Sequence, residues 1–110
     1  ASDVYKRQVQ YLTDYGWEVV HSPVQTQQVR IPSEVTDVYD RYNALQMSQG
    51  FNLTDYAGKT ATRYVYEIKN YPNASDPVYA TLLVYRDQVI GADITDTSAN
   101  GVVQGLEMPG

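Results

Sequence analysis

The residues best suited to chemistry lie in one short acidic segment, Asp96–Glu107. Its oxygen-bearing side chains occupy the first, third, fifth and twelfth positions, and Gly101 occupies the sixth, as in the calcium-binding loop of an EF-hand. A predicted strand precedes this segment, where an EF-hand has a helix. Two interpretations therefore stay open, a calcium-dependent adhesion or sensing module and a polar turn with a chance acid, and no residue is assigned as a metal ligand.

Two pairs of carboxylates are candidates for glycoside hydrolysis, Glu67 with Asp93 and Asp87 with Asp96. That reaction needs two carboxyl groups on either side of the scissile bond, and adjacent strands or turns can supply the separation. Any sheet with several acids offers such pairs. A carboxylate-based hydrolase of cell-wall glycan therefore remains an alternative.

Other catalytic side chains are scarce, because the chain contains one His and no Cys. The lack of Cys excludes disulfides, thiolate catalysis and cysteine metal sites. The single imidazole, His21, has no recognisable acid or base partner nearby in the sequence and resembles an exposed or edge-strand residue. We therefore expect no enzymatic activity and no cofactor.

Tyrosine is the most unusual feature of the composition, with 11 Tyr against one Phe and one Trp. Its apolar ring and polar tip suit surfaces that recognise a partner. Strand alternation places Tyr64 with Tyr66 on one face of a predicted strand, and Tyr79 with Tyr85 on one face of the next. Cross-strand pairing would gather these four into an aromatic patch. We predict them as partner-binding residues, and the alternative is that Tyr simply packs well across strands.

Length and charge narrow the remaining classes of function. At 110 residues and 43% hydrophobic, the chain is sufficient for one domain spanning 1–110. The net charge is -5 and no Lys/Arg cluster is present, so nucleic acid is not an expected partner. The sequence has no apolar stretch of about 18 residues, no initiator Met and no signal pattern. We expect contact with a membrane only through an anchor that this chain does not contain.

Periodicity in the first half of the chain predicts two helices and two short strands. The first helix covers residues 2–15, with Ser2 as its cap and Gly16 as its stop. Short strands follow at 17–21 and 27–31, and Pro23 between them indicates an edge or bend. A second helix begins at Pro32 and Ser33 and ends at Gly50. Its apolar stripe comprises Val35, Val38, Tyr39, Tyr42 and Leu45.

The second half predicts an antiparallel meander with strands near 60–71, 78–86 and 88–95, the last two joined by a tight Arg86-Asp87 turn. Residues 97–110 have weak helical character broken by glycine and proline, and this tail is a candidate for poor order. The fold class is α+β, in the order α-β-β-α-β-β-β. We expect both helices on one face of a twisted, mainly antiparallel sheet of four to five strands.

A set of short motifs is specific in its order along the chain, although no single motif is a catalytic signature. The set comprises Tyr11-Leu12 with Gly16-Trp17, Ile31-Pro32, Tyr42-Asn43 with Gln46 and Gly50-Phe51, Leu53 with Tyr56 and Gly58-Lys59, Arg63-Tyr64 with Tyr66, Asn70-Tyr71-Pro72, Leu82-Leu83-Val84-Tyr85, and Val89-Ile90-Gly91 with Asp93. In this order the motifs resemble a bacterial family of domains of unknown function, number forty-eight thirty.

The resemblance implies an exported or membrane-anchored protein with no established activity. We therefore expect an extracytoplasmic, non-enzymatic binding or structural module, whose partner is an unknown protein or cell-wall glycan. Members of the family end with an acidic residue, Gly, two bulky apolar residues, His, Gly and Leu. Here Gln104 stands at the position of that His, so no role of the family's His carries over to this chain.

Overall fold

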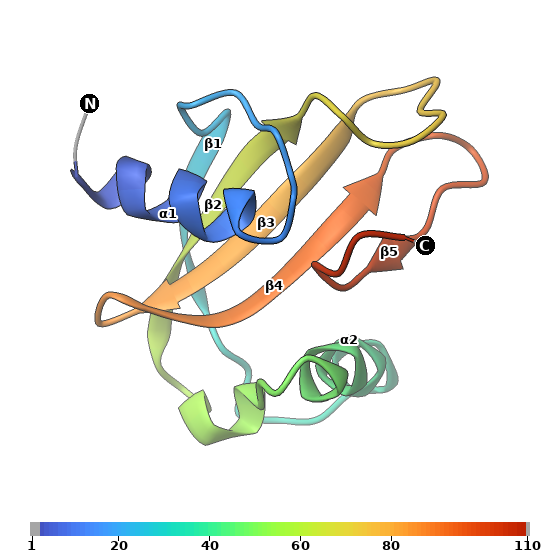
Figure 1. Cartoon of the computed structure of the whole chain (residues 1–110). Helices are drawn as coiled ribbons and strands as arrows, with labels where there is room; N and C mark the ends of the chain where they lie inside the picture. Colours follow the sequence, from blue (N-terminus) through green and yellow to red (C-terminus); the bar gives the residue numbers. More distant parts are fainter. Residues whose placement is uncertain (1–2, 110) are drawn as a thin grey trace.

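A five-stranded antiparallel sheet organises the computed structural model, which describes residues 3–109 (Figure 1). Its strands follow one another in chain order across the sheet, and this confirms the α+β class and the predicted meander. The predicted strand at 17–21 is reduced to one isolated bridge between Val19 and Ile68. The elements are α1 (Asp3–Thr13), β1 (Gln25–Arg30), α2 (Asp37–Ser48), the short 3-10 helix η1 (Leu53–Tyr56), β2 (Thr60–Ile68), β3 (Val78–Tyr85), β4 (Gln88–Asp96) and β5 (Val103–Gln104).

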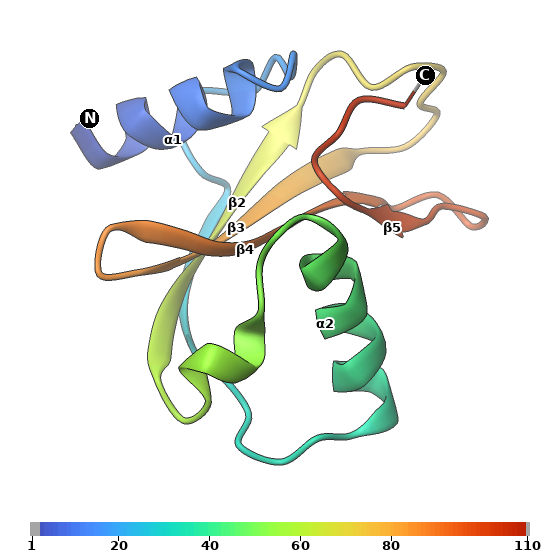
Figure 2. The same cartoon turned by 60° about the horizontal axis from the view of Figure 1, so that its bottom comes forward.

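The two helices lie on opposite faces of the sheet, so the prediction that both pack on one face is wrong (Figure 2). From β2, Tyr66 donates a hydrogen bond of 2.6 Å to Gln8 of α1 and pairs in register with Ala80. From β4, Asp93 accepts one of 2.6 Å from Tyr42 of α2 and pairs in register with Thr81. Because consecutive strand residues point to opposite faces, the positions of Ala80 and Thr81 place the two helices on opposite sides. The side chains of β3 are largely buried on both faces of the sheet, so other elements must pack against each face.

The first helix ends as the sequence predicts, and Trp17 then anchors the chain beneath it. Gly16 has φ +96, a left-handed conformation that favours glycine. The predicted cap Ser2 lies outside the described residues. Trp17 is completely buried, stacks on the ring of Tyr71 and donates a hydrogen bond of 2.7 Å to the carbonyl of Leu106.

The C-terminal tail is part of the sheet, in place of the weak helix or poorly ordered segment considered from the sequence. β5 pairs with β4, and Leu106 beyond it is completely buried. Gly105 is needed for packing, since a Cβ there would lie 2.9 Å from the Gln49 side chain. The same glycine was interpreted from the sequence as a helix breaker.

The second helix begins at Asp37, later than the predicted start at Pro32. Thr36 stops further extension toward the N-terminus, because it is extended and its hydroxyl accepts the backbone N–H of Tyr39 at 3.2 Å. Val35 therefore precedes the helix, and Val38 is 70% exposed. The stripe that packs on the sheet begins at Tyr39 and continues with Tyr42.

Two glutamines at the end of α2, Gln46 in its last turn and the C-cap residue Gln49, hydrogen-bond to backbone groups of β4 and of the tail. Gln46 accepts a hydrogen bond of 2.8 Å from the N–H of Ala92. Gln49 donates one of 2.9 Å to the carbonyl of Ala92 and accepts one of 2.8 Å from the N–H of Leu106. These amide side chains take the place of a neighbouring strand where β5 no longer pairs with β4. They thereby join α2, the sheet and the tail.

Replacing Gln49 with Ala tests this connection. We expect Gln49→Ala to lower the free energy of unfolding by about 2–4 kcal/mol, because two buried backbone groups lose their partner. Urea denaturation measures the change, and hydrogen exchange is expected to accelerate at the Leu106 amide. Met47→Ala is the matched control, since that side chain is 57% exposed on the same helical turn. Equal effects of the two substitutions would contradict the proposed role of Gln49.

Candidate functional site

The four tyrosines predicted to bind a partner do not share one surface. Tyr64 and Tyr66 face α1, where the Tyr64 ring meets Tyr5 edge-on at 6.3 Å and Tyr66 is completely buried. Tyr79 and Tyr85 lie on the opposite face, by the alternation along β3. The structure therefore does not assemble the predicted four-residue patch, and it makes Tyr66 a core residue.

Tyr85 and Tyr79 also differ from each other in their surroundings. The Tyr85 ring packs edge-on against Tyr56 of η1 at 5.6 Å, and the Arg86 guanidinium lies over it at 5.3 Å. Tyr79 lies beyond the part of this face that α2 and η1 cover, in a hollow of about 580 Å³ that we call the open end of the sheet. A role for Tyr79 in partner binding stays a prediction. The open end is lined by Val24, Gln25, Arg63, Val65, Tyr79, Thr81, Thr95 and Thr97.

The segment proposed as a calcium loop is a β-hairpin. The N–H of Asp96 donates to the carbonyl of Val102 at 3.2 Å, and β5 then runs back along β4 away from Asp96. An EF-hand loop instead brings its first and twelfth positions to one ion. Glu107 lies five residues past Val102 on the returning chain, so the segment does not form the loop of an EF-hand that the spacing suggested.

The two carboxylate pairs considered for hydrolysis are not arranged around a shared cleft. Asp87 directly precedes the nine-residue strand β4, and Asp96 is its last residue. The length of the strand places them roughly 25–30 Å apart, whereas the two carboxyl groups of a glycosidase lie about 5–10 Å apart. Glu67 is exposed on β2, whereas Asp93 is buried beneath α2, and β3 lies between β2 and β4.

His21 is exposed in the bend before β1.

Asp93 is the most deeply buried acid among the described residues, with 5% of its surface exposed. It accepts hydrogen bonds from Tyr42 at 2.6 Å and from Thr95 at 2.8 Å. Burial raises the pKa of Asp93, and the two hydrogen bonds and the charge of Arg63 oppose that rise only in part. This carboxyl group therefore couples the packing of α2 to pH.

The raised pKa of Asp93 determines the direction in which the stability of the fold changes with pH. Between the ordinary Asp pKa and the raised value, the folded chain binds more protons than the unfolded chain at Asp93, so its stability falls as pH rises through that window. Asp93→Asn removes this dependence. We expect wild type to gain stability relative to the variant as pH is lowered from 7 to about 4, measured by urea denaturation. A difference between the two proteins that does not change with pH would contradict this assignment.

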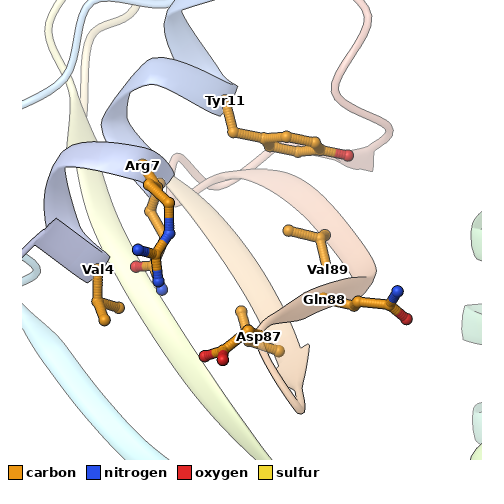
Figure 3. Close-up of a pocket in the computed structure, with 8 residues that line it drawn as sticks. Val4, Arg7, Tyr11, Asp87, Gln88 and Val89 are labelled. Atoms are coloured by element: carbon orange, nitrogen blue, oxygen red, sulfur yellow. The ribbon is translucent and has the colours of Figure 1, made fainter.

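A cavity of about 440 Å³ lies between α1 and the hairpin of β3 and β4 (Figure 3). Its wall combines valine side chains, the Tyr11 ring and four polar side chains. Burial and a hydrogen bond with Tyr15 raise the pKa of Tyr11, so its phenol stays neutral. The cavity is lined by Val4, Arg7, Gln8, Tyr11, Val84, Asp87, Gln88 and Val89.

Gln8 is the unusual member of this wall. It is 5% exposed, and its Oε1 accepts the Tyr66 hydroxyl at 2.6 Å. Its Nε2 is shielded from solvent and has no hydrogen-bond partner within the described part of the chain. An unpaired buried donor costs about 1–3 kcal/mol. Two other buried polar atoms lack partners, Gln46 Nε2 and the Tyr39 hydroxyl, but neither residue lines this cavity.

The hairpin turn presents Asp87 at the same cavity. Arg86 has φ 49 and Asp87 has φ 63, so both central residues of the predicted turn are left-handed. Such turns normally contain Asn, Asp or Gly, so Asp87 suits its position and Arg86 is the strained residue of the pair.

Sequence analysis did not identify this cavity, because Arg7 and Gln8 belong to no motif. A signal was nevertheless present. Gln8 falls three residues after Tyr5 and four before Leu12, on the buried side of the first helix. A polar residue on an apolar helical stripe requires a specific partner.

The structure is a small α+β domain with a cavity between α1 and the β3–β4 hairpin. The chain belongs to the family described as Domain of unknown function (DUF4830), whose model matches residues 11–94. No curated protein and no solved structure matches the chain. The matched residues include Tyr11 and the β3–β4 hairpin, whereas Arg7 and Gln8 precede them. No helix in residues 3–109 is long and apolar enough to cross a membrane.

Proposed function

We propose that this domain is a non-enzymatic binding module whose ligand occupies the cavity between α1 and the β3–β4 hairpin. The observation that carries the proposal is the cavity of about 440 Å³, whose wall combines valine side chains and the Tyr11 ring with exposed polar side chains. Small-molecule sites are concave, mostly apolar and about 300–1,000 Å³ in volume, with a few polar groups that orient the ligand. Arg7, Asp87 and Gln88 are the exposed polar groups of this wall.

The composition of the cavity wall supports binding over hydrolysis. Among residues 3–109, Asp87 is the only carboxylate in the wall, whereas a glycosidase of the ordinary kind needs two. The aromatic ring of Tyr11 and the valines provide a surface for apolar groups or for the face of a sugar ring. The wall therefore has the groups needed to hold and orient a ligand.

Ligand-dependent melting tests this function. The probes are an amino acid, a dipeptide, glucose and N-acetylglucosamine, each at about 10 mM. At a hundred times its dissociation constant, a ligand stabilises the folded state by about 2.7 kcal/mol, so we expect at least one probe to raise the melting temperature. The increase should disappear in Arg7→Met and persist in Lys6→Met, because Lys6 is exposed on the same helix but does not line the cavity. A shift that survives Arg7→Met but not Tyr79→Ala would move the site to the open end of the sheet.

We also propose that the domain functions outside the cytoplasm, as the family resemblance implies. The lack of Cys is compatible with an oxidising compartment, where a free thiol would be exposed to oxidation. The test is protease digestion of intact cells that express the natural full-length protein with an epitope tag beside this domain. Loss of the tag from intact cells supports the location, and protection until lysis would contradict it.

A further inference from the structure

We infer that two copies of this chain associate through their β1 strands, which pair antiparallel and join the two sheets into one. This inference goes beyond the proposed function and does not depend on the cavity. It starts from the contrast between the two edges of the sheet, whose strands lie in the order β1-β2-β3-β4-β5. At one edge β5 has only two residues, whereas β1 at the other edge has six.

The edge of β1 has none of the features that usually prevent pairing with another chain. Such features are proline, lysine, a bulge or a covering element. The sequence of the strand is QTQQVR, all six residues pair with β2 in one register, and five of the six are exposed. An exposed and regular edge of this length is a template for a further strand.

The register of β1 on β2 identifies which of its backbone groups are free. The N–H of Ile31 donates to the carbonyl of Lys59 at 2.8 Å, so the backbone groups of Ile31 point toward β2. Along an antiparallel pair, such residues alternate with residues whose groups point away. The N–H and C=O groups of Thr26, Gln28 and Arg30 therefore point away from β2, which is the only strand neighbour of β1 among residues 3–109.

These three residues are self-complementary in one register. If Gln28 lies opposite Gln28 of the second copy, Thr26 lies opposite Arg30, and all three form hydrogen-bonded pairs across the interface. A shift by two residues in one direction would place Arg30 opposite Val24, whose N–H already donates to β2 at 2.7 Å. A shift in the other direction would place Thr26 opposite Pro32, which has no N–H. Only the register centred on Gln28 therefore uses every free group.

The charges of the protein favour this edge for self-association. Each copy carries a net charge of -5, so two copies repel each other in most orientations. β1 contains no acidic residue, and its only charged side chain is that of Arg30. In the register centred on Gln28, each Arg30 meets a neutral Thr26, so no like charges lie directly opposite each other. The two Gln28 side chains do lie opposite each other, and each amide can both donate and accept a hydrogen bond.

Analytical ultracentrifugation of the full chain tests the association. One strand pair is a small interface compared with the roughly 1,200–2,000 Å² of stable ones, so we expect a weak dimer that forms between about 10 µM and 1 mM. Gln28→Lys and Gln28→Glu each place like charges opposite each other and should weaken the dimer about fivefold. An equimolar mixture of the two variants should associate more tightly than either variant alone, because the opposed charges then attract.

Matched controls separate this effect from changes in net charge or folding. Gln10→Lys and Gln10→Glu make the same changes in net charge at an exposed position of α1, so their mixture should show no gain over either variant alone. Circular dichroism checks that each variant is folded.

Amide hydrogen exchange locates the interface on the strand. As the protein concentration rises, the amides of Thr26, Gln28 and Arg30 should exchange more slowly. The amides of Gln27 and Val29 already face β2, so their exchange should not depend on concentration.

Three outcomes would overturn the inference. A chain that stays monomeric at about 1 mM would leave the edge of β1 to an extended segment of another protein. A mixture of the two Gln28 variants that shows no gain would exclude the register centred on Gln28. Concentration-dependent protection confined to other strands would exclude β1 as the interface. None of these results bears on ligand binding in the cavity, which the melting experiment tests separately.

Discussion

The side chain of Gln49 joins two segments of the backbone. It donates a hydrogen bond to the carbonyl of Ala92 in the middle of β4 and accepts one from the N–H of Leu106 in the tail. The carbonyl of Leu106 in turn accepts the indole N–H of Trp17 directly after α1. The positions of both helices therefore depend on a short series of buried hydrogen bonds around the tail. This arrangement holds α2 on one face of the sheet and the end of α1 on the other, and the cavity forms where the start of α1 passes over the β3–β4 hairpin.

Much of the fold could be predicted because local signals agreed with the tertiary structure. Alternating apolar residues predicted the strands β2, β3 and β4, and the Arg86-Asp87 pair predicted the hairpin turn. Pro23 indicated an edge or bend, and β1 is an edge strand of the sheet. The placement of the helices could not be predicted in the same way. β3 is largely buried on both faces, so its alternation does not distinguish one covered face from two. The role of Gly105 was also hidden, because it depends on Gln49, far away in the sequence.

The site was harder to predict than the fold, because its residues have meaning only together. Tyrosine content suggested one aromatic surface, but the register of β2 and β3 places the four candidates on two faces. The acidic segment at Asp96 matched a spacing without its structural context, and it forms a hairpin. Arg7 and Gln8 belong to no motif, and the cavity that they line exists only once α1 packs against the β3–β4 hairpin. The candidate site therefore depends on tertiary packing more than on residue type.

The most direct test of ligand binding in the cavity is an NMR titration with the probe that raises the melting temperature. If the ligand occupies the cavity, the backbone amides of α1 and of the β3–β4 hairpin shift with the ligand concentration. Shifts confined to Tyr79 and its neighbours at the open end of the sheet would contradict the account.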